Sequence, residues 1–212
     1  SDLVFMLVFG AFLRLRGGGL GYLAFVLVGL AAWRPFARAV RGAASTARSH
    51  EPLLLSFPVP LASLPVAEVG GALVEGAPVM VVFFAAAGVL GGVGSPAHLV
   101  AGLVAGLSVQ LAATLGVALL VTVAGALWRD ASRALPALVA VAMFFSPVVY
   151  PTELVPAAWR GLYLANPMSA AIECYGWALG GPAPPAWPVV AAALLSGALL
   201  LGGAAAVGLW NV

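Results

Sequence analysis

Five charged side chains have a spacing that suggests a site within an otherwise apolar chain. Glu68 and Glu75 are seven residues apart, which places both on one face of a helix. An ionised side chain at the bilayer centre costs about 2.5 to 3.5 kcal/mol, so we expect both to face the bundle interior or a watery vestibule. For Glu68, near the cytoplasmic end of its span, an interfacial position is the favoured alternative, whereas Glu75 is deeper. Arg34, Arg38 and Arg41 follow an i, i+4, i+7 pattern and also share a face. We expect that face either to anchor at anionic lipid headgroups or to meet a cytoplasmic partner.

A second candidate region is the segment from Met143 to Tyr175, which combines aromatic and polar residues with four prolines. Each proline prevents a helix from continuing undistorted. Broken, half-polar backbone at membrane depth is tolerated only when it is buried in protein or lines a wet cavity. The segment therefore predicts a re-entrant or interfacial helical hairpin on the outer side of the membrane. For any single Trp or Tyr, an aromatic belt at the headgroups is the alternative.

The residue types also exclude several chemistries. All nine basic residues are arginine, so the chain has no lysine for a P-loop or for a Schiff-base cofactor. His50 and His98 have no further ligands at metal-binding spacing, and Cys174 is the one cysteine, so the sequence predicts neither a metal site nor an internal disulfide. A net charge of +2 does not indicate nucleic-acid binding. We expect no catalytic residue and no cofactor in this chain, and any energy from ATP must enter through a partner.

The elements that position these residues are predicted to be membrane-spanning helices. Hydrophobic residues make up 63% and charged residues 8% of the 212 residues, and no Asp, Glu, Lys or Arg occurs from Gly76 to Trp128. A crossing needs about 20 apolar residues, so that stretch holds two. The sequence predicts an all-α integral membrane protein, a single domain covering residues 1–212. The expected spans are 3–13 (partial), 20–40, 65–90, 99–127, 134–150 and 188–210.

Arginine counts predict the orientation of these spans. Positive residues concentrate in cytoplasmic loops, and six arginines fall on one side of the spans against three on the other. The loop 42–64 and the turn 128–133 are therefore expected in the cytoplasm, and 91–98 and 151–187 outside. Within the first loop, Ser45 to Leu55 fits one or two short surface helices, which would either dock a soluble partner or form a solvated connector. The six arginines on the expected cytoplasmic side are Arg34, Arg38, Arg41, Arg48, Arg129 and Arg133, and the three on the expected outer side are Arg14, Arg16 and Arg160.

Several short motifs resemble one known family over nearly the whole chain. The strongest is SPVVYP at 146–151, with Asn166-Pro167 fifteen residues beyond it. In their order and spacing, the motifs are similar to those of the membrane permease subunits of bacterial ATP-binding cassette exporters for surface polysaccharides and polyol phosphates, the capsule, O-antigen and teichoic acid exporters. The other matching pieces are Gly29-Leu30 with Trp33, Phe57-Pro58, Leu64-Pro65, Arg129-Asp130 and Val155-Pro156.

The resemblance implies a six-span ABC exporter permease fold that forms a homodimer in the inner membrane of a bacterium. It implies a soluble ATP-binding subunit that carries ATP and magnesium, and a lipid-linked glycan as the transported substrate. A coupling helix for the ATPase maps to Ser45–Leu55, with Arg48, His50, Glu51, Leu53 and Leu54 as its candidate residues. The segment 152–179 maps to short gate helices. The candidate channel and gate residues are Phe144, Phe145, Tyr150, Trp159, Tyr163 and Asn166.

Other interpretations stay open at this point. A drug or lipid exporter of the same fold would share most of these motifs, and a non-transporting membrane scaffold is a further class. A proton-coupled secondary carrier would use Glu68 and Glu75, although the inverted repeats typical of such carriers are absent from the sequence. Members of the resembled family begin with an amphipathic helix and a complete first span, so we expect this sequence to be a fragment or a truncated product. Gly88-x-x-x-Gly92 and Gly102-x-x-x-Gly106 could mark close helix contacts, but 26 glycines make chance matches common.

Overall fold

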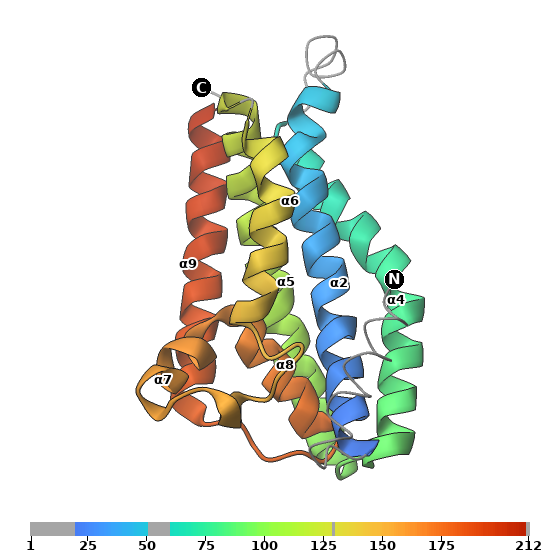
Figure 1. The fold of residues 1–212 in the computed structure, drawn as a ribbon. Coiled ribbons are helices and arrows are strands. Elements are labelled where there is room, and N and C mark those ends of the chain that lie inside the picture. The colour runs from blue at the N-terminus through green and yellow to red at the C-terminus, as the bar shows by residue number, and fades with distance from the viewer. Residues whose placement is uncertain (1–19, 51–59, 129, 211–212) are drawn as a thin grey trace.

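The computed structural model describes residues 20–50, 60–128 and 130–210, and this part of the chain is helical without a β-strand (Figure 1). Four of its helices are long and apolar enough to cross a membrane, since at 1.5 Å per residue each exceeds the roughly 30 Å of hydrocarbon. The all-α fold expected from the sequence is confirmed for these residues, and the partial span expected at 3–13 lies outside them. The four helices are α2 (Leu20–Ser49), α4 (Ser63–Gly91), α5 (Pro96–Leu127) and α9 (Ala186–Trp210).

The chain between α5 and α9 is divided into short elements, as the prolines predict. The span expected at 134–150 is shorter in the structure, because its helix ends at Phe145 and Ser146 has extended backbone angles. The physical reason is Pro147, which disfavours helical geometry in the residue before it. The short elements are α6 (Ala131–Ala142), η1 (Met143–Phe145), η2 (Thr152–Leu154), α7 (Ala157–Ala165) and α8 (Pro167–Ala178).

Helix α2 is longer than the span expected at 20–40, because it continues to Ser49. The residues beyond Val40 keep the helical period, with buried Ala43, Ala44 and Thr46 on the packed face. The Ser45–Leu55 segment is therefore not wholly a separate surface element: its first five residues are the end of α2. Residues 51–59 lie outside the described part of the chain.

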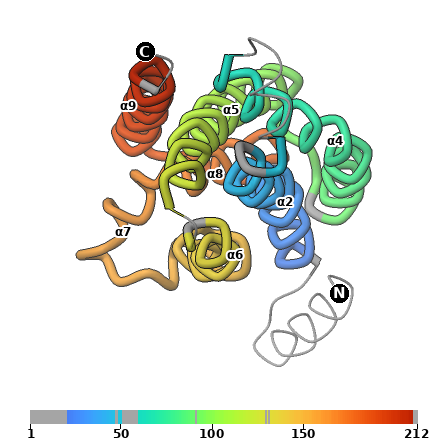
Figure 2. Tube along the Cα trace, turned by 90° about the horizontal axis from the view of Figure 1, so that it is seen from above, coloured from blue at the N-terminus to red at the C-terminus, as the bar shows by residue number. Residues whose placement is uncertain are grey.

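The long helices form a row from which two shorter elements project. Seen from above, α9 and α4 lie at opposite ends, with α5 and α2 between them, and α6 and α7 lie on one side of this row (Figure 2). Helix α5 is the centre of the packing, since it contacts α2, α8 and α9, while α2 packs along α4. The core around α2 combines alanines and valines with larger side chains, among them Leu30, Trp33 and Tyr175.

Glycines allow α8 to lie close against α5. A Cβ at Gly102 would come within 2.6 Å of the Cys174 carbonyl oxygen, and one at Gly106 within 2.5 Å of Cε1 of Tyr175. Only a residue without a Cβ fits such distances. Gly102-x-x-x-Gly106 is therefore a helix-contact motif. A Cβ at Gly92 would meet nothing within 4 Å. The other pair, Gly88-x-x-x-Gly92, is therefore not a helix-contact motif of this kind.

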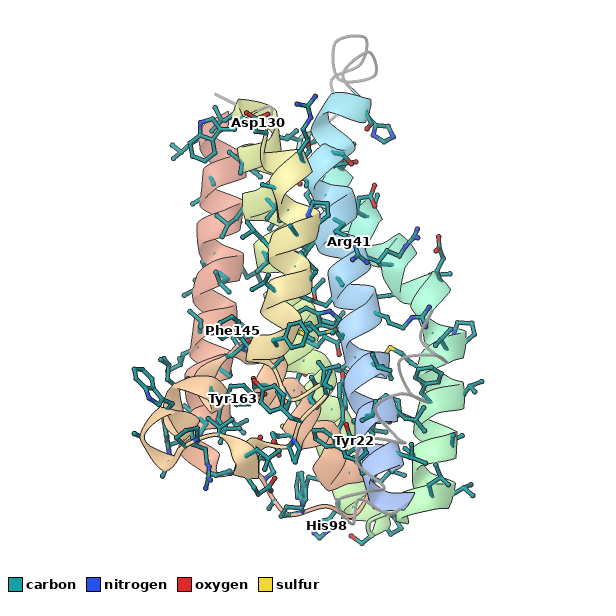
Figure 3. The ribbon with its side chains drawn as sticks, in the orientation of Figure 1. Tyr22, Arg41, His98, Asp130, Phe145 and Tyr163 are labelled. Atoms are coloured by element: carbon teal, nitrogen blue, oxygen red, sulfur yellow. The ribbon has the colours of Figure 1, made fainter. Side chains whose placement is uncertain are left out.

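The alternation of the spans places the loops at two ends of the bundle, marked in Figure 3 by His98 and by Asp130. The His98 end holds the start of α2, the turn between α4 and α5, and the short helices α7 and α8 (Figure 1). The Asp130 end holds the end of α2, the start of α4 and the junction of α5 with α6. This grouping agrees with the loop alternation predicted from the sequence.

Candidate functional site

The SPVVYP segment passes through the protein interior beside α2. Ser146 and the two valines that follow Pro147 are buried, and the hydroxyl of Tyr22 donates a hydrogen bond of 2.7 Å to the carbonyl oxygen of Val149. A Cβ at Gly29 would lie 2.7 Å from the Cα of Val148, so the glycine lets this backbone approach the helix. The motif thus follows the end of the helical segment formed by α6 and η1 and is fixed against α2.

Asn166 joins the end of η1 to the start of α8. Its Nδ2 donates to the carbonyl oxygen of Phe145 at 2.9 Å and to Oγ of Ser146 at 3.1 Å. Its Oδ1 accepts from the backbone N–H of Met168 at 3.1 Å, and Pro167 follows as the first helical residue. One side chain therefore satisfies a carbonyl left free by the helix break and caps the next helix.

These contacts join α7 and α8 in a helical hairpin; whether it is re-entrant or interfacial in a membrane stays a prediction. Helix α8 begins beside Phe145, which Figure 3 places farther from His98 than Tyr163. Helix α8 ends at the His98 end of the bundle. There the N–H of Gly94, in the turn before α5, donates a hydrogen bond of 3.3 Å to the carbonyl oxygen of Ala178. The segment therefore enters the bundle and returns to the same end, as the prolines predict.

The candidate gate residues are brought together with one exception. A cavity of 670 Å³ is lined by Phe145, Tyr150, Trp159, Tyr163 and Asn166, together with aliphatic residues. The rings of Tyr150 and Tyr163 lie 5.9 Å apart, and the Tyr150 hydroxyl donates to the carbonyl oxygen of Phe144. Phe144 is the exception, because its side chain lines a different cavity, described below.

This aromatic cavity combines exposed rings with a protonated phenol. Phe145 and Trp159 are each 64% exposed, so large aromatic faces are open to whatever surrounds or enters this end. Burial raises the pKa of the Tyr163 phenol, and Tyr150 and Glu173 add to the effect. Tyr163 therefore stays protonated, and the cavity offers aromatic faces and hydroxyl groups without a fixed charge from this ring.

A carboxyl group lines a separate cavity beside the hairpin. The Thr152 hydroxyl donates to Oε1 of Glu173, and both residues line a cavity of 250 Å³ with Glu153. Burial raises the pKa of Glu173; the hydrogen bond from Thr152 lowers it, and the charge of Glu153 raises it. The guanidinium of Arg160 donates to the backbone carbonyls of Glu153 and Val155, at 3.1 and 3.2 Å, and so fixes the turn that carries Thr152.

The charged residues of the spans form a second candidate site. Nη2 of Arg38 lies 2.6 Å from Oε1 of Glu75, with the two side chains 50% and 60% exposed. Both line a cavity of 590 Å³ between α2, α4 and α6, which Arg34, Arg41 and Phe144 also line. Glu75 therefore lines a cavity, and its position in a watery vestibule stays a prediction. Glu68 accepts from Oγ1 of Thr46 at 3.3 Å, near the Asp130 end, and does not belong to this cavity.

Of the candidate coupling residues, Arg48 and His50 belong to the described part of the chain. Arg48 belongs to the last turn of α2, and His50 follows that helix. Nδ1 of His50 lies 3.0 Å from the Thr46 carbonyl oxygen. Glu51, Leu53 and Leu54 fall outside the described residues. Within the described ranges, no group of three His, Cys, Asp or Glu side chains could hold a metal ion.

A buried polar bridge in the middle of the bundle was not predicted from the sequence. Nε2 of Gln110 donates to the Ala32 carbonyl at 3.0 Å, and the Tyr175 hydroxyl donates to Oε1 of Gln110 at 2.6 Å. The bridge ties α2, α5 and α8 together. The available signal was a single glutamine within an uncharged apolar stretch.

Comparison with known proteins adds no identification, since no protein-family model and no curated protein matches this chain.

Proposed function

We propose that this chain is the transmembrane subunit of an ATP-binding cassette exporter that moves a lipid-linked polysaccharide or polyol phosphate across the cytoplasmic membrane. The observation that carries the proposal is the helical hairpin of α7 and α8 with its aromatic cavity at one end of the bundle. It occurs at the motif, SPVVYP followed by Asn166-Pro167, on which the family resemblance rests.

The chemistry of the cavity suits a sugar chain. Sugar rings present C–H faces that pack on aromatic rings and hydroxyl groups that exchange hydrogen bonds with phenols. The 670 Å³ cavity lies within the roughly 300 to 1,000 Å³ typical of ligand sites. Exposed Phe145 and Trp159 would continue this surface toward a second copy of the chain or toward the membrane.

Helix α2 provides a route for force across the membrane. Its Ser49 end adjoins the proposed coupling segment, and Gly29 contacts the SPVVYP backbone about 30 Å along the helix axis. The chain has no lysine for a P-loop. A partner ATPase that pushes on the Asp130 end would therefore tilt α2 and shift the loop that Tyr22 and Gly29 hold. The arginine counts predict a cytoplasmic location for the Asp130 end, and the proposal adopts this orientation.

The test is capture of the ATPase from native membranes. A tagged full chain, purified in mild detergent, should bring down a Walker-motif protein identified by mass spectrometry. Leu53→Asp and Leu54→Asp should abolish this capture, because a charge in an apolar docking element is costly to bury. The matched control is Ala97→Asp, an exposed position at the His98 end, which should leave capture intact.

Two results would contradict the proposal. One is the absence of any nucleotide-binding protein from the wild-type sample. The other is equal loss of the ATPase in the control and in the two loop variants, since the loss would then reflect general damage. Release of a glycan-linked lipid or of a drug by the reconstituted complex would distinguish the polysaccharide exporter from a drug exporter of the same fold.

A further inference from the structure

Helix α7 exposes large apolar side chains at the His98 end of the bundle. Leu154, just before α7, and Trp159 and Leu162 within it are each 64% to 70% exposed. The three residues line one cavity and therefore lie together. An exposed apolar patch of this kind marks a contact with a protein or with a membrane. What covers it can be inferred from α9, the helix that α7 contacts.

The exposed patch continues from α7 onto α9 through Trp187. A Cβ at Gly161 of α7 would lie 3.0 Å from Cη2 of Trp187, so the indole ring packs directly on α7. Trp187 is itself 61% exposed, and exposed leucines such as Leu194 and Leu201 follow it along α9. Helix α9 is long and apolar enough to cross a membrane. The α7–α9 patch, which consists of Leu154, Trp159, Leu162 and Trp187, is thus continuous with the apolar surface of a span.

The length of α9 limits the depth of Trp187. Helix α9 runs about 36 Å along its axis, against roughly 30 Å of hydrocarbon. The crossing does not extend beyond its start, because residues 181–185 are not helical and are largely exposed, and lipid does not satisfy backbone polar groups. The other end of α9 lies level with the junction of α5 and α6, where Asp130 is exposed (Figure 1). Wherever the hydrocarbon layer is set between these limits, Trp187 lies within about 6 Å of its edge.

Charged residues beside the patch argue against a position deep in the hydrocarbon. Arg160 follows Trp159 directly, and its guanidinium donates to the carbonyl oxygens of Glu153 and Val155. Glu153 is exposed. Charges are costly at the bilayer centre, whereas exposed leucine and tryptophan are unfavourable in water. The boundary between headgroups and acyl chains satisfies both, because a tryptophan ring is amphipathic and an arginine there can reach water.

We propose that the α7–α9 patch anchors the hairpin to the lipid surface, with Trp159, Leu162 and Trp187 at the boundary between headgroups and acyl chains at the His98 end. Helix α7 is then interfacial and does not enter the hydrocarbon. The anchor goes beyond the proposed function and does not depend on it. The aromatic cavity, which Trp159 and Leu162 also line, opens at the same depth.

The experiment measures the depth of single nitroxide labels on the full chain in phosphatidylcholine nanodiscs. Buried Cys174, the one cysteine of the chain, is first replaced by alanine. Labels are then attached to Trp159→Cys, Leu162→Cys and Trp187→Cys. Their collisions with oxygen, which concentrates among acyl chains, are compared with their collisions with a water-soluble nickel chelate. The three labels should have equal depth, near the glycerol groups of the lipid.

Two matched controls define the depth scale. Leu194→Cys is on the exposed surface of α9, about 10 Å along the axis from Trp187, and its label should be deeper. Ala183→Cys is in the exposed loop before α9, and its label should collide mainly with nickel. A second measurement needs no label: Trp159→Phe should reduce the tryptophan emission that bromine near the headgroup quenches more than the emission that bromine at the chain ends quenches.

Equal depth of the labels at 159 and 187, at the lipid boundary, supports the anchor. The proposal is overturned if the label at 159 is as deep as the label at 194, because α7 would then be re-entrant. It is also overturned if nickel reaches position 159 as freely as position 183, or if neither oxygen nor nickel reaches it, because water or a second copy of the chain would then cover the patch. None of these measurements involves the ATPase, so the anchor and the proposed function fail separately.

Discussion

The most specific structural prediction concerns Gln110, which bridges three helices near the middle of the bundle. Gln110 lies about 21 Å along α5 from Pro96 and about 26 Å from Leu127. Gln110 and Tyr175 are 1% and 0% exposed. Neither side chain can therefore replace a lost hydrogen bond with bulk water. The perturbation is Gln110→Leu, which preserves approximate volume and removes both hydrogen bonds of the side chain.

The expected loss follows from the two contacts. Interhelical hydrogen bonds in membranes contribute about 0.6 kcal/mol on average and up to about 1.7 kcal/mol. Gln110→Leu removes two of them and leaves the Tyr175 hydroxyl buried without its acceptor, which costs about 1 to 3 kcal/mol. We expect the free energy of unfolding to fall by about 2 to 4 kcal/mol. Tyr175→Phe removes one bond and should cost about 1 to 2 kcal/mol.

The measurement is a double-mutant cycle followed by equilibrium unfolding in mixed micelles. Gln110→Leu with Tyr175→Phe removes both partners of the 2.6 Å bond, so no hydroxyl is left unsatisfied. The double variant should be more stable than the sum of the two single losses predicts, by about 1 to 2 kcal/mol. Ser108→Ala, at an exposed position on the same helix, is the control and should have little effect.

Two outcomes would refute the reasoning. Strict additivity of the two single variants would mean that Gln110 and Tyr175 do not interact in the folded protein. A Gln110→Leu variant no less stable than Ser108→Ala would mean that the bridge contributes nothing to the packing of α2, α5 and α8.

Two further predictions concern the hairpin. Gly29→Val should destabilise the protein by more than about 2 kcal/mol in the same unfolding assay, because a Cβ there would lie 2.7 Å from the Val148 backbone. The control is Gly21→Val, because a Cβ at Gly21 meets nothing within 4 Å. Equal losses of stability in the two variants would argue against the contact between Gly29 and Val148. Burial raises the pKa of Glu173, so the folded state binds this proton more tightly than the unfolded state and stability falls as pH rises above the ordinary glutamate range. The wild type should therefore unfold at a higher temperature near pH 5 than near pH 8, and Glu173→Gln should reduce this difference; an unchanged difference would show that other groups cause it.

Local patterns in the sequence were sufficient for the elements and their faces. The uncharged stretch from Gly76 to Trp128 predicted two long helices with a turn between them, and α4 and α5 fill it. The i, i+4, i+7 spacing of Arg34, Arg38 and Arg41 predicted one shared face, and the three are exposed together. These features depend on hydrophobicity and helical period, both of which are properties of neighbouring residues. Helix ends were less accurate, since packing of α2 beyond Val40 is not encoded locally.

Only the tertiary structure decided which of these faces meet. The partner of Arg38 is Glu75, 37 residues away, and the partner of Gln110 is Tyr175, 65 residues away. Asn166 became a junction because the broken span ends beside it, not because of its own neighbours. Such contacts depend on the relative placement of whole helices, which hydrophobic pattern leaves undetermined in a bilayer, where every apolar face is already compatible with lipid.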